Sequence, residues 1–188
     1  MQFFLEEAGI ITKQEHTTSL SGNIIVKKSS PRIEFRGRLD SLDAFVVAIQ
    51  ILAKCEGFPA LVDKLEEIRV KVRDLFSCEV TGKPCEDLSL WGLSSDEIRE
   101  RSHHPERYFG IGHILPHHTM GIVAATLNTL RTQVREAELS ACRAFDGETS
   151  PERPDIIKVL NRLSGAVYIL IYSYLPDGYD KTITFAAP

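Results

Sequence analysis

Four polar side chains in the segment 127–138 have types and spacings that suit the binding of an anion. Asn128, Arg131, Arg135 and Glu138 follow one another at intervals of three, four and three residues. On a helix of 3.6 residues per turn they form one charged stripe. Because guanidinium groups pair with phosphate oxygens through parallel hydrogen bonds, two arginines one turn apart beside a carboxylate predict a polyphosphate site. The alternative is a solvated helix face that carries ion pairs.

Two other segments carry polar groups where a simple core helix would not need them. Arg32, Arg36 and Asp40 recur every fourth residue and form a second polar stripe. Asn161 precedes Gly165 by four residues, and both residue types lower helix propensity in a helix interior. Either Asn161 reaches a ligand, or the missing side chain at Gly165 permits close packing of another helix.

A cluster of histidines raises the question of a metal site. Five of them fall between residues 103 and 118, and imidazole is a common ligand of transition metals. No spacing among them resembles a metalloprotease motif or a zinc finger, so we assign no metal ligand and keep a histidine-loop metal enzyme only as a weaker alternative. The histidines are His103, His104, His113, His117 and His118.

The four cysteines contain no CxxC pair. Cys78 and Cys85 flank a turn-like segment, which would allow a disulfide only in an oxidising compartment. We expect free thiols, mostly buried.

The elements that must position these residues are predicted to be helices. Apolar residues recur at helical spacing, and almost no alternation of period two is seen outside residues 23–26 and the tail. The sequence therefore predicts an all-α bundle in one domain, with residues 1–30 irregular, 31–175 forming the bundle and 176–188 a tail. The long helices are expected at about 31–55, 59–76, 119–145 and 154–174, with a short one opened by Ser94 or Ser95.

Predicted core stripes accompany these helices. The stripe of the first contains Ile33, Leu39, Leu42, Val46 and Ile49. That of the third contains Ile122, Val123, Leu127, Leu130, Val134 and Ala141.

Composition limits the class of protein. The chain has 188 residues, of which 43% are hydrophobic and 26% charged, as in an ordinary soluble domain. A net charge of −4 argues against a general nucleic-acid binder, although a local basic pocket for one nucleotide remains compatible with it. No apolar run is long enough to span a bilayer, and the first residues carry acids rather than a signal's positive charge. We therefore expect a cytoplasmic protein with no nucleic-acid or membrane partner.

Taken together, three segments resemble the ATP:cob(I)alamin adenosyltransferases, a family of trimeric five-helix bundles. They are PRIEFRGRLDSLDAF, LRTQVREAE and LNRLS, in this order along the chain. The similarity covers about residues 18–173 and is greatest to the ethanolamine-utilisation branch, through GLSSDEIRERSHHPERYFGIGHILP and RPDIIKVLNRLSGAVY. The resemblance implies an enzyme that transfers the 5′-deoxyadenosyl group of ATP to the cobalt of a reduced corrinoid.

The resemblance also implies roles for particular residues. Arg135 matches the arginine that contacts the triphosphate, and Arg131 matches one that pairs with an aspartate of the neighbouring subunit, here Asp40. Glu138 closes the same motif and Asn161 matches an asparagine of the nucleotide pocket. Others are expected to bind substrate as well. They are Lys28 on the phosphate-side loop, Arg32 and Asn128 from the two stripes, and His113 at the place of the aromatic residue that shields the lower face of cobalt.

The implied substrates and partners follow from this chemistry. ATP and cobalamin are the substrates, and Mg²⁺ is held largely by the phosphates. The resemblance implies a homotrimer with sites between subunits, and a reductase or a cobalamin-dependent enzyme as a further partner.

Three departures from the family pattern leave an alternative open. The family's Thr-Gly-Asp-x-Gly phosphate loop is replaced by ITKQEHTTSLSG, and Gly165 stands in place of a common aspartate. The ethanolamine branch also carries an N-terminal His- and Cys-rich metal motif that this sequence lacks. The alternative is a non-catalytic corrinoid- or nucleotide-binding module, such as a chaperone or sensor.

Overall fold

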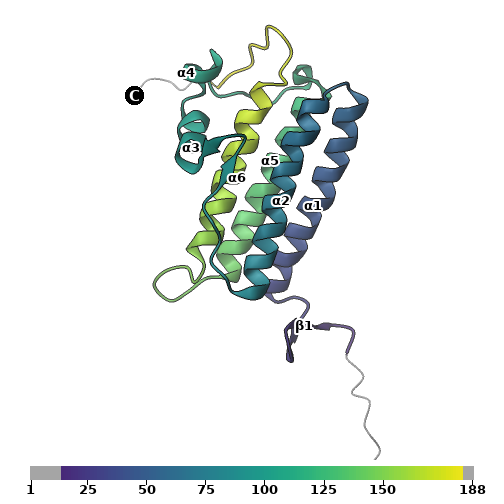
Figure 1. The fold of residues 1–188 in the computed structure, drawn as a ribbon, viewed down its shortest axis with the longest axis vertical. Coiled ribbons are helices and arrows are strands. Elements are labelled where there is room, and N and C mark those ends of the chain that lie inside the picture. Colours follow the sequence, from purple (N-terminus) through teal and green to yellow (C-terminus); the bar gives the residue numbers. More distant parts are fainter. Residues whose placement is uncertain (1–13, 184–188) are drawn as a thin grey trace, which may run out of the picture.

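Four long helices lie side by side and form the bundle (Figure 1). The computed structural model describes residues 14–183, and the prediction of an all-α bundle is confirmed there. The long helices are α1 (Pro31–Cys55), α2 (Pro59–Thr81), α5 (Gly121–Ala144) and α6 (Pro154–Tyr172).

Smaller elements fill the connections. Between α2 and α5 lie β3 (Ser89–Leu90), β4 (Leu93–Ser94), α3 (Ser95–His103), α4 (Pro105–Phe109) and the 3-10 turn η1 (His118–Met120). Two antiparallel strands, β1 (Thr17–Ser21) and β2 (Ile24–Lys27), form a hairpin beyond the end of the bundle where α1 begins (Figure 1). The segment predicted as irregular before residue 31 thus contains a hairpin, and the expectations for residues 1–13 lie outside the described residues.

Helix ends follow local chemistry. Pro31, Pro59 and Pro154 stand in the first turns of their helices, where a missing N–H costs nothing. α2 ends at Thr81 rather than at the predicted 76, because the stop is Gly82, which adopts a left-handed conformation with φ of 72°.

The core lies where the apolar stripes of the four long helices meet. The predicted stripes are mostly buried, with two corrections. In α1 the stripe begins at Phe35 rather than Ile33, because Phe35 lies one turn before Leu39 on the same face. In α5, Ile122 is 56% exposed, and Val123 next to it faces the core instead.

An ion pair at the start of α6 anchors the first part of the connection from α2 to α3. Arg153 donates to the carbonyls of Cys78 (3.1 Å) and Lys83 (2.8 Å), and to the carboxylate of Asp155 (2.8 Å). Asp155 in turn accepts the backbone N–H of Cys85 at 2.8 Å. The hydrogen bond from Arg153 is the main reason why the pKa of Asp155 falls to about 2.

All four cysteines are free thiols, as expected. Their predicted burial is wrong for Cys55 and Cys142, which are exposed, whereas Cys78 and Cys85 are partly buried. Among residues 14–183, no helix is long and apolar enough to cross a membrane.

Candidate functional site

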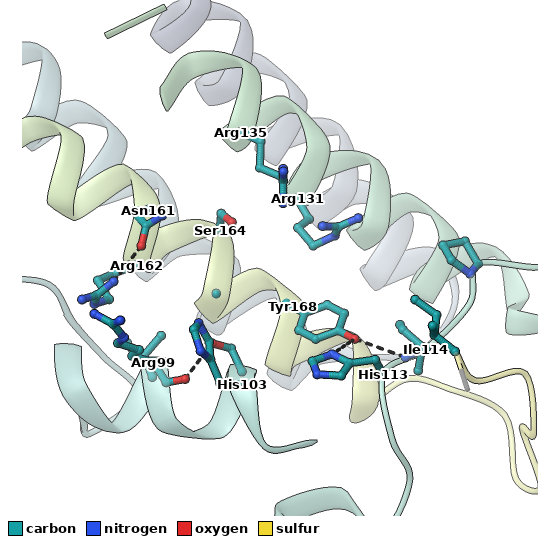
Figure 2. A pocket seen from close by; sticks show the side chains of 15 residues that line it. Arg99, His103, His113, Ile114, Arg131, Arg135, Asn161, Arg162, Ser164 and Tyr168 are labelled. Carbon is teal, nitrogen blue, oxygen red and sulfur yellow. Dashed lines mark hydrogen bonds between the residues drawn. The ribbon is translucent and has the colours of Figure 1, made fainter. Parts of the chain in front are cut away.

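A cavity of about 410 Å³ opens between α3, α5, α6 and the segment that precedes η1 (Figure 2). Its lining includes arginine and histidine side chains from three helices and from the segment before η1, and no carboxylate of residues 14–183. The basic residues are Arg99, His103, His113, Arg131, Arg135 and Arg162.

The α5 wall of the cavity carries Arg131 and Arg135, as the stripe predicted. Arg131 donates from Nε to the amide oxygen of Asn128 at 3.0 Å, and its guanidinium lies 5.6 Å from the centre of the Tyr168 ring. Within residues 14–183 neither arginine forms an ion pair with a carboxylate. Burial and the neighbouring charge of Arg135 lower the pKa of Arg131, although an arginine stays protonated under such conditions. This pair is therefore positively charged and open to an anion.

The α6 wall presents Asn161 to the cavity, and its amide is held from both sides. The amide nitrogen donates to Glu138 at 2.9 Å, and the amide oxygen accepts from Arg162 at 2.6 Å (Figure 2 shows the second contact). Glu138 thus faces Asn161 rather than an arginine, and Arg135 has no carboxylate partner among the described residues.

An aromatic wall closes the opposite end of the cavity. The rings of His113 and Tyr168 are nearly parallel, with centroids 6.0 Å apart, and His113 Nδ1 lies 3.2 Å from the Tyr168 hydroxyl (Figure 2). That hydroxyl lies 2.9 Å from the hydroxyl of Tyr172, which donates to the carbonyl of Gly112 at 3.0 Å. Burial raises the pKa of Tyr172, so this phenol remains a donor. His113 is therefore held in one orientation by a chain of hydrogen bonds.

Five predicted site residues do not line this cavity within one chain. Two of them contact residues that do: Asn128 accepts from Arg131, and Glu138 accepts from Asn161. The other three lie farther away. Lys28 follows the hairpin, and Arg32 is bound to Glu79, which accepts from Arg32 Nε at 2.7 Å. Asp40 lies beside a separate groove between α1 and α2. The structure of one chain does not bring Asp40 and Arg131 together, so the roles predicted for Lys28, Arg32 and Asp40 stay predictions.

The histidines of residues 103–118 are spread over several surroundings. His103 and His113 line the cavity, His104 lies 3.8 Å from Glu100, and the rings of His117 and His118 contact each other. Over the described part of the chain, no group of three or more His, Cys, Asp or Glu side chains is arranged to hold a metal ion.

Sequence interpretation missed Arg99 and Tyr168 as lining residues. A signal existed for Tyr168, because it lies two helical turns after Asn161 and therefore on the same face. Arg99 had no comparable signal, since its place depends on where α3 packs. What the assembled walls offer is a cationic region for a polyphosphate beside an aromatic surface for a flat, apolar group.

Comparison with known proteins gives a matching family. A family model described as cobalamin adenosyltransferase matches residues 10–174. The corrinoid adenosyltransferase EutT of Salmonella typhimurium is 37% identical over 163 residues, which is 86% of this chain and 60% of the relative. EutT of Escherichia coli K12 gives the same identity and coverage. The chain thus spans about 60% of the length of the curated relatives that it matches.

Proposed function

The chain belongs to the cobalamin adenosyltransferase family, and from this premise we propose that it transfers the 5′-deoxyadenosyl group of ATP to the cobalt of a reduced corrinoid. The observation that carries the proposal is the cavity in which Arg131 and Arg135 meet no carboxylate of residues 14–183, with Arg131 beside the ring of Tyr168. The cationic part of this cavity suits a triphosphate, and its aromatic wall suits contact with one face of a corrinoid.

The reaction forms one bond and breaks one bond. Cobalt(I) of the corrinoid supplies the electron pair for the new cobalt–carbon bond to C5′ of ATP. The C5′–O bond breaks, and triphosphate leaves with its electron pair. The protein must align the two reactants and stabilise the charge that develops on the leaving oxygen.

We assign the second task to Arg135 and Arg131. Their guanidinium groups donate to phosphate oxygens, and their own repulsion falls when an anion lies between them. Asn128 and Asn161 fix the positions of neighbouring side chains, Arg131 and Arg162. Glu138 holds Asn161 and so acts as a positioning residue.

The corrinoid is proposed to lie against the wall made by His113 and Tyr168. The hydrogen bond between their side chains keeps both rings in place. A flat wall at this point would exclude a lower ligand from the cobalt, in keeping with the role that His113 was assigned by resemblance.

Magnesium fits this site only through its ligands on the nucleotide. The cavity lining contains no carboxylate, and among residues 14–183 no side-chain group suits a metal ion. We infer that Mg²⁺ would arrive bound to the phosphates, which is its usual mode.

We infer that a homotrimer would bring Asp40 of one copy to the site of another. Asp40 is exposed on α1 and, among the described residues, has no ion pair, so it is free to meet Arg131 of a second copy. Light scattering of the purified protein tests this proposal. We expect a trimer, and a larger monomer fraction for Asp40→Ala; a wild-type monomer at micromolar concentration would refute it.

The activity is tested by an anaerobic assay with chemically reduced cobalamin, ATP and Mg²⁺. Loss of the cob(I)alamin absorbance with formation of a light-sensitive product is the expected result. Tight binding of ATP or corrinoid without that product would instead identify a binding module that lacks the reaction.

A further inference from the structure

α3 brings basic side chains to the cavity from outside the four-helix bundle. The helix starts at Ser94 with a capping box, in which Ser94 and Glu97 satisfy each other's backbone N–H groups. Ile98 and Ser102 are buried, and Arg99 and His103, each the next residue along, line the cavity. The position of Arg99 therefore depends on how α3 packs against α6.

Gly165 is the point at which α6 allows this packing. A Cβ at this position would lie 3.1 Å from Ser102 Oγ and 3.5 Å from Ile98 Cγ2. The Ser102 hydroxyl that occupies this space donates to the carbonyl of Arg99 at 2.9 Å. The structure thus favours the packing explanation of Gly165. Because Ser102 bonds the carbonyl of Arg99, this packing also fixes the backbone that carries Arg99.

Arg99 and Arg162 line the same cavity, and no carboxylate of the described part of the chain lies between them. Figure 2 shows both on the side of α3 and α6, whereas Arg131 and Arg135 project from α5. Within the described residues Arg99 forms no ion pair, and Arg162 bonds only the neutral amide of Asn161. The Nε atom of Arg162 is buried and has no hydrogen-bond partner within residues 14–183. A buried donor without an acceptor costs free energy that an anion would recover.

We propose that Arg99 of α3 and Arg162 of α6 form a second anion subsite, which binds a phosphate group apart from the contacts of Arg131 and Arg135. The proposal rests on the proposed function, because its ligand is one of the two substrates. Two sources share this chemistry: the polyphosphate of the nucleotide and the phosphodiester of a complete corrinoid. Arginine suits either, since its planar fork donates two parallel hydrogen bonds to phosphate.

The test compares Arg99→Ala with Arg101→Ala on the same helix. Arg101 stacks over the ring of Tyr108 at 5.3 Å and does not line the cavity, so the control removes the same charge elsewhere. Calorimetry measures the affinity of each variant for ATP, inorganic tripolyphosphate, cobalamin and cobinamide, the last of which lacks the phosphodiester. We expect Arg99→Ala to weaken binding of a phosphate-bearing ligand about tenfold, as for one lost hydrogen bond to a charged group, and Arg101→Ala to weaken it less than twofold.

The pattern of losses identifies the source. Weaker binding of ATP and tripolyphosphate assigns the subsite to the nucleotide. Weaker binding of cobalamin with unchanged cobinamide assigns it to the corrinoid. If the wild-type protein binds its substrates and Arg99→Ala binds all four ligands equally well, the second subsite is refuted while the proposed function stands. If the wild-type protein binds none of them, the proposed function itself fails.

Discussion

Two pairs of arginines in this molecule have the same spacing and opposite surroundings. Arg32 and Arg36 of α1 share the buried carboxylate of Glu79, which is 1% exposed. Arg131 and Arg135 of α5 have no carboxylate partner in the described chain and line a cavity instead. The difference shows that arginines at i and i+4 do not by themselves mark a binding site. What matters is whether another helix supplies a carboxylate, and Glu79 lies 47 residues from Arg32.

The largest effect on activity is expected at the two arginines of α5. Arg135→Ala should lower kcat/KM for adenosylation about 10²- to 10³-fold, as for loss of one preorganised group that stabilises transition-state charge. Its unfolding free energy should stay close to that of the wild type. The control is Arg143→Ala on the same helix, because the one ion pair that Arg143 forms in the described chain is an exposed contact with Glu34. Wild-type kinetics for Arg135→Ala would show that the triphosphate contact lies elsewhere.

At the paired site the loss should appear in stability. Glu79→Gln leaves two arginine charges without their carboxylate and should destabilise the fold by about 3 kcal/mol, as for a buried ion pair that loses one partner. Glu136→Gln is the matched control, since Glu136 pairs with Arg38 at the surface at 2.8 Å and should cost about 1 kcal/mol or less. Urea unfolding of both variants measures the difference. Equal losses would mean that burial of Glu79 has no energetic consequence.

The pair Arg153–Asp155 extends the comparison to pH. The pKa of Asp155 is lowered from 3.8 to about 2, so its stabilisation is complete above pH 4 and is lost as the pH falls towards 2. Asp155→Asn should therefore cost about 2 kcal/mol at pH 6, and the difference from the wild type should shrink between pH 4 and pH 2. Urea titrations at several pH values measure the unfolding free energy of both proteins. If their difference stays constant between pH 4 and pH 2, the charge of Asp155 is not its cause.

The smallest effect is expected at Gly165. Alanine favours a helix by about 1 kcal/mol over glycine, but here its Cβ would press on Ser102 Oγ at 3.1 Å. Gly165→Ala should therefore gain little or no stability, and should weaken the Arg99 subsite about two- to threefold in the binding assay, on the order of half of one hydrogen bond. Gly37→Ala in α1 is the control, because a Cβ there meets nothing within 4 Å and should stabilise the fold. If both substitutions stabilise the fold equally, α3 shifts away from the added Cβ at residue 165 without loss of stability.

The sequence was sufficient for features that depend on local periodicity. The helix start at Pro31 and the stripe that carries Arg131 and Arg135 both follow from spacing within one segment. The pairing of Glu79 with Arg32 and Arg36 was missed, because nothing in the sequence around Glu79 indicates that two distant arginines will bind it. Arg99 was missed for a similar reason, since its approach to the cavity requires the absent side chain of Gly165 on another helix. Lys28 and Asp40 do not line the cavity of one chain, so periodicity within one segment could not test their predicted roles.

The attachment of α3 has a consequence for how the cavity opens. α3 has its own N-terminal cap and, within the described chain, packs mainly against α6, so its detachment would leave the interfaces of α1, α2 and α5 intact. Segments of this kind exchange their amide hydrogens through local opening, at a free energy below that of global unfolding. Amides of α3 should thus exchange faster than those of α5. Local detachment of α3 would then admit a large planar substrate, whereas global unfolding would require all four long helices to separate. A substitution could change the first equilibrium without changing the second.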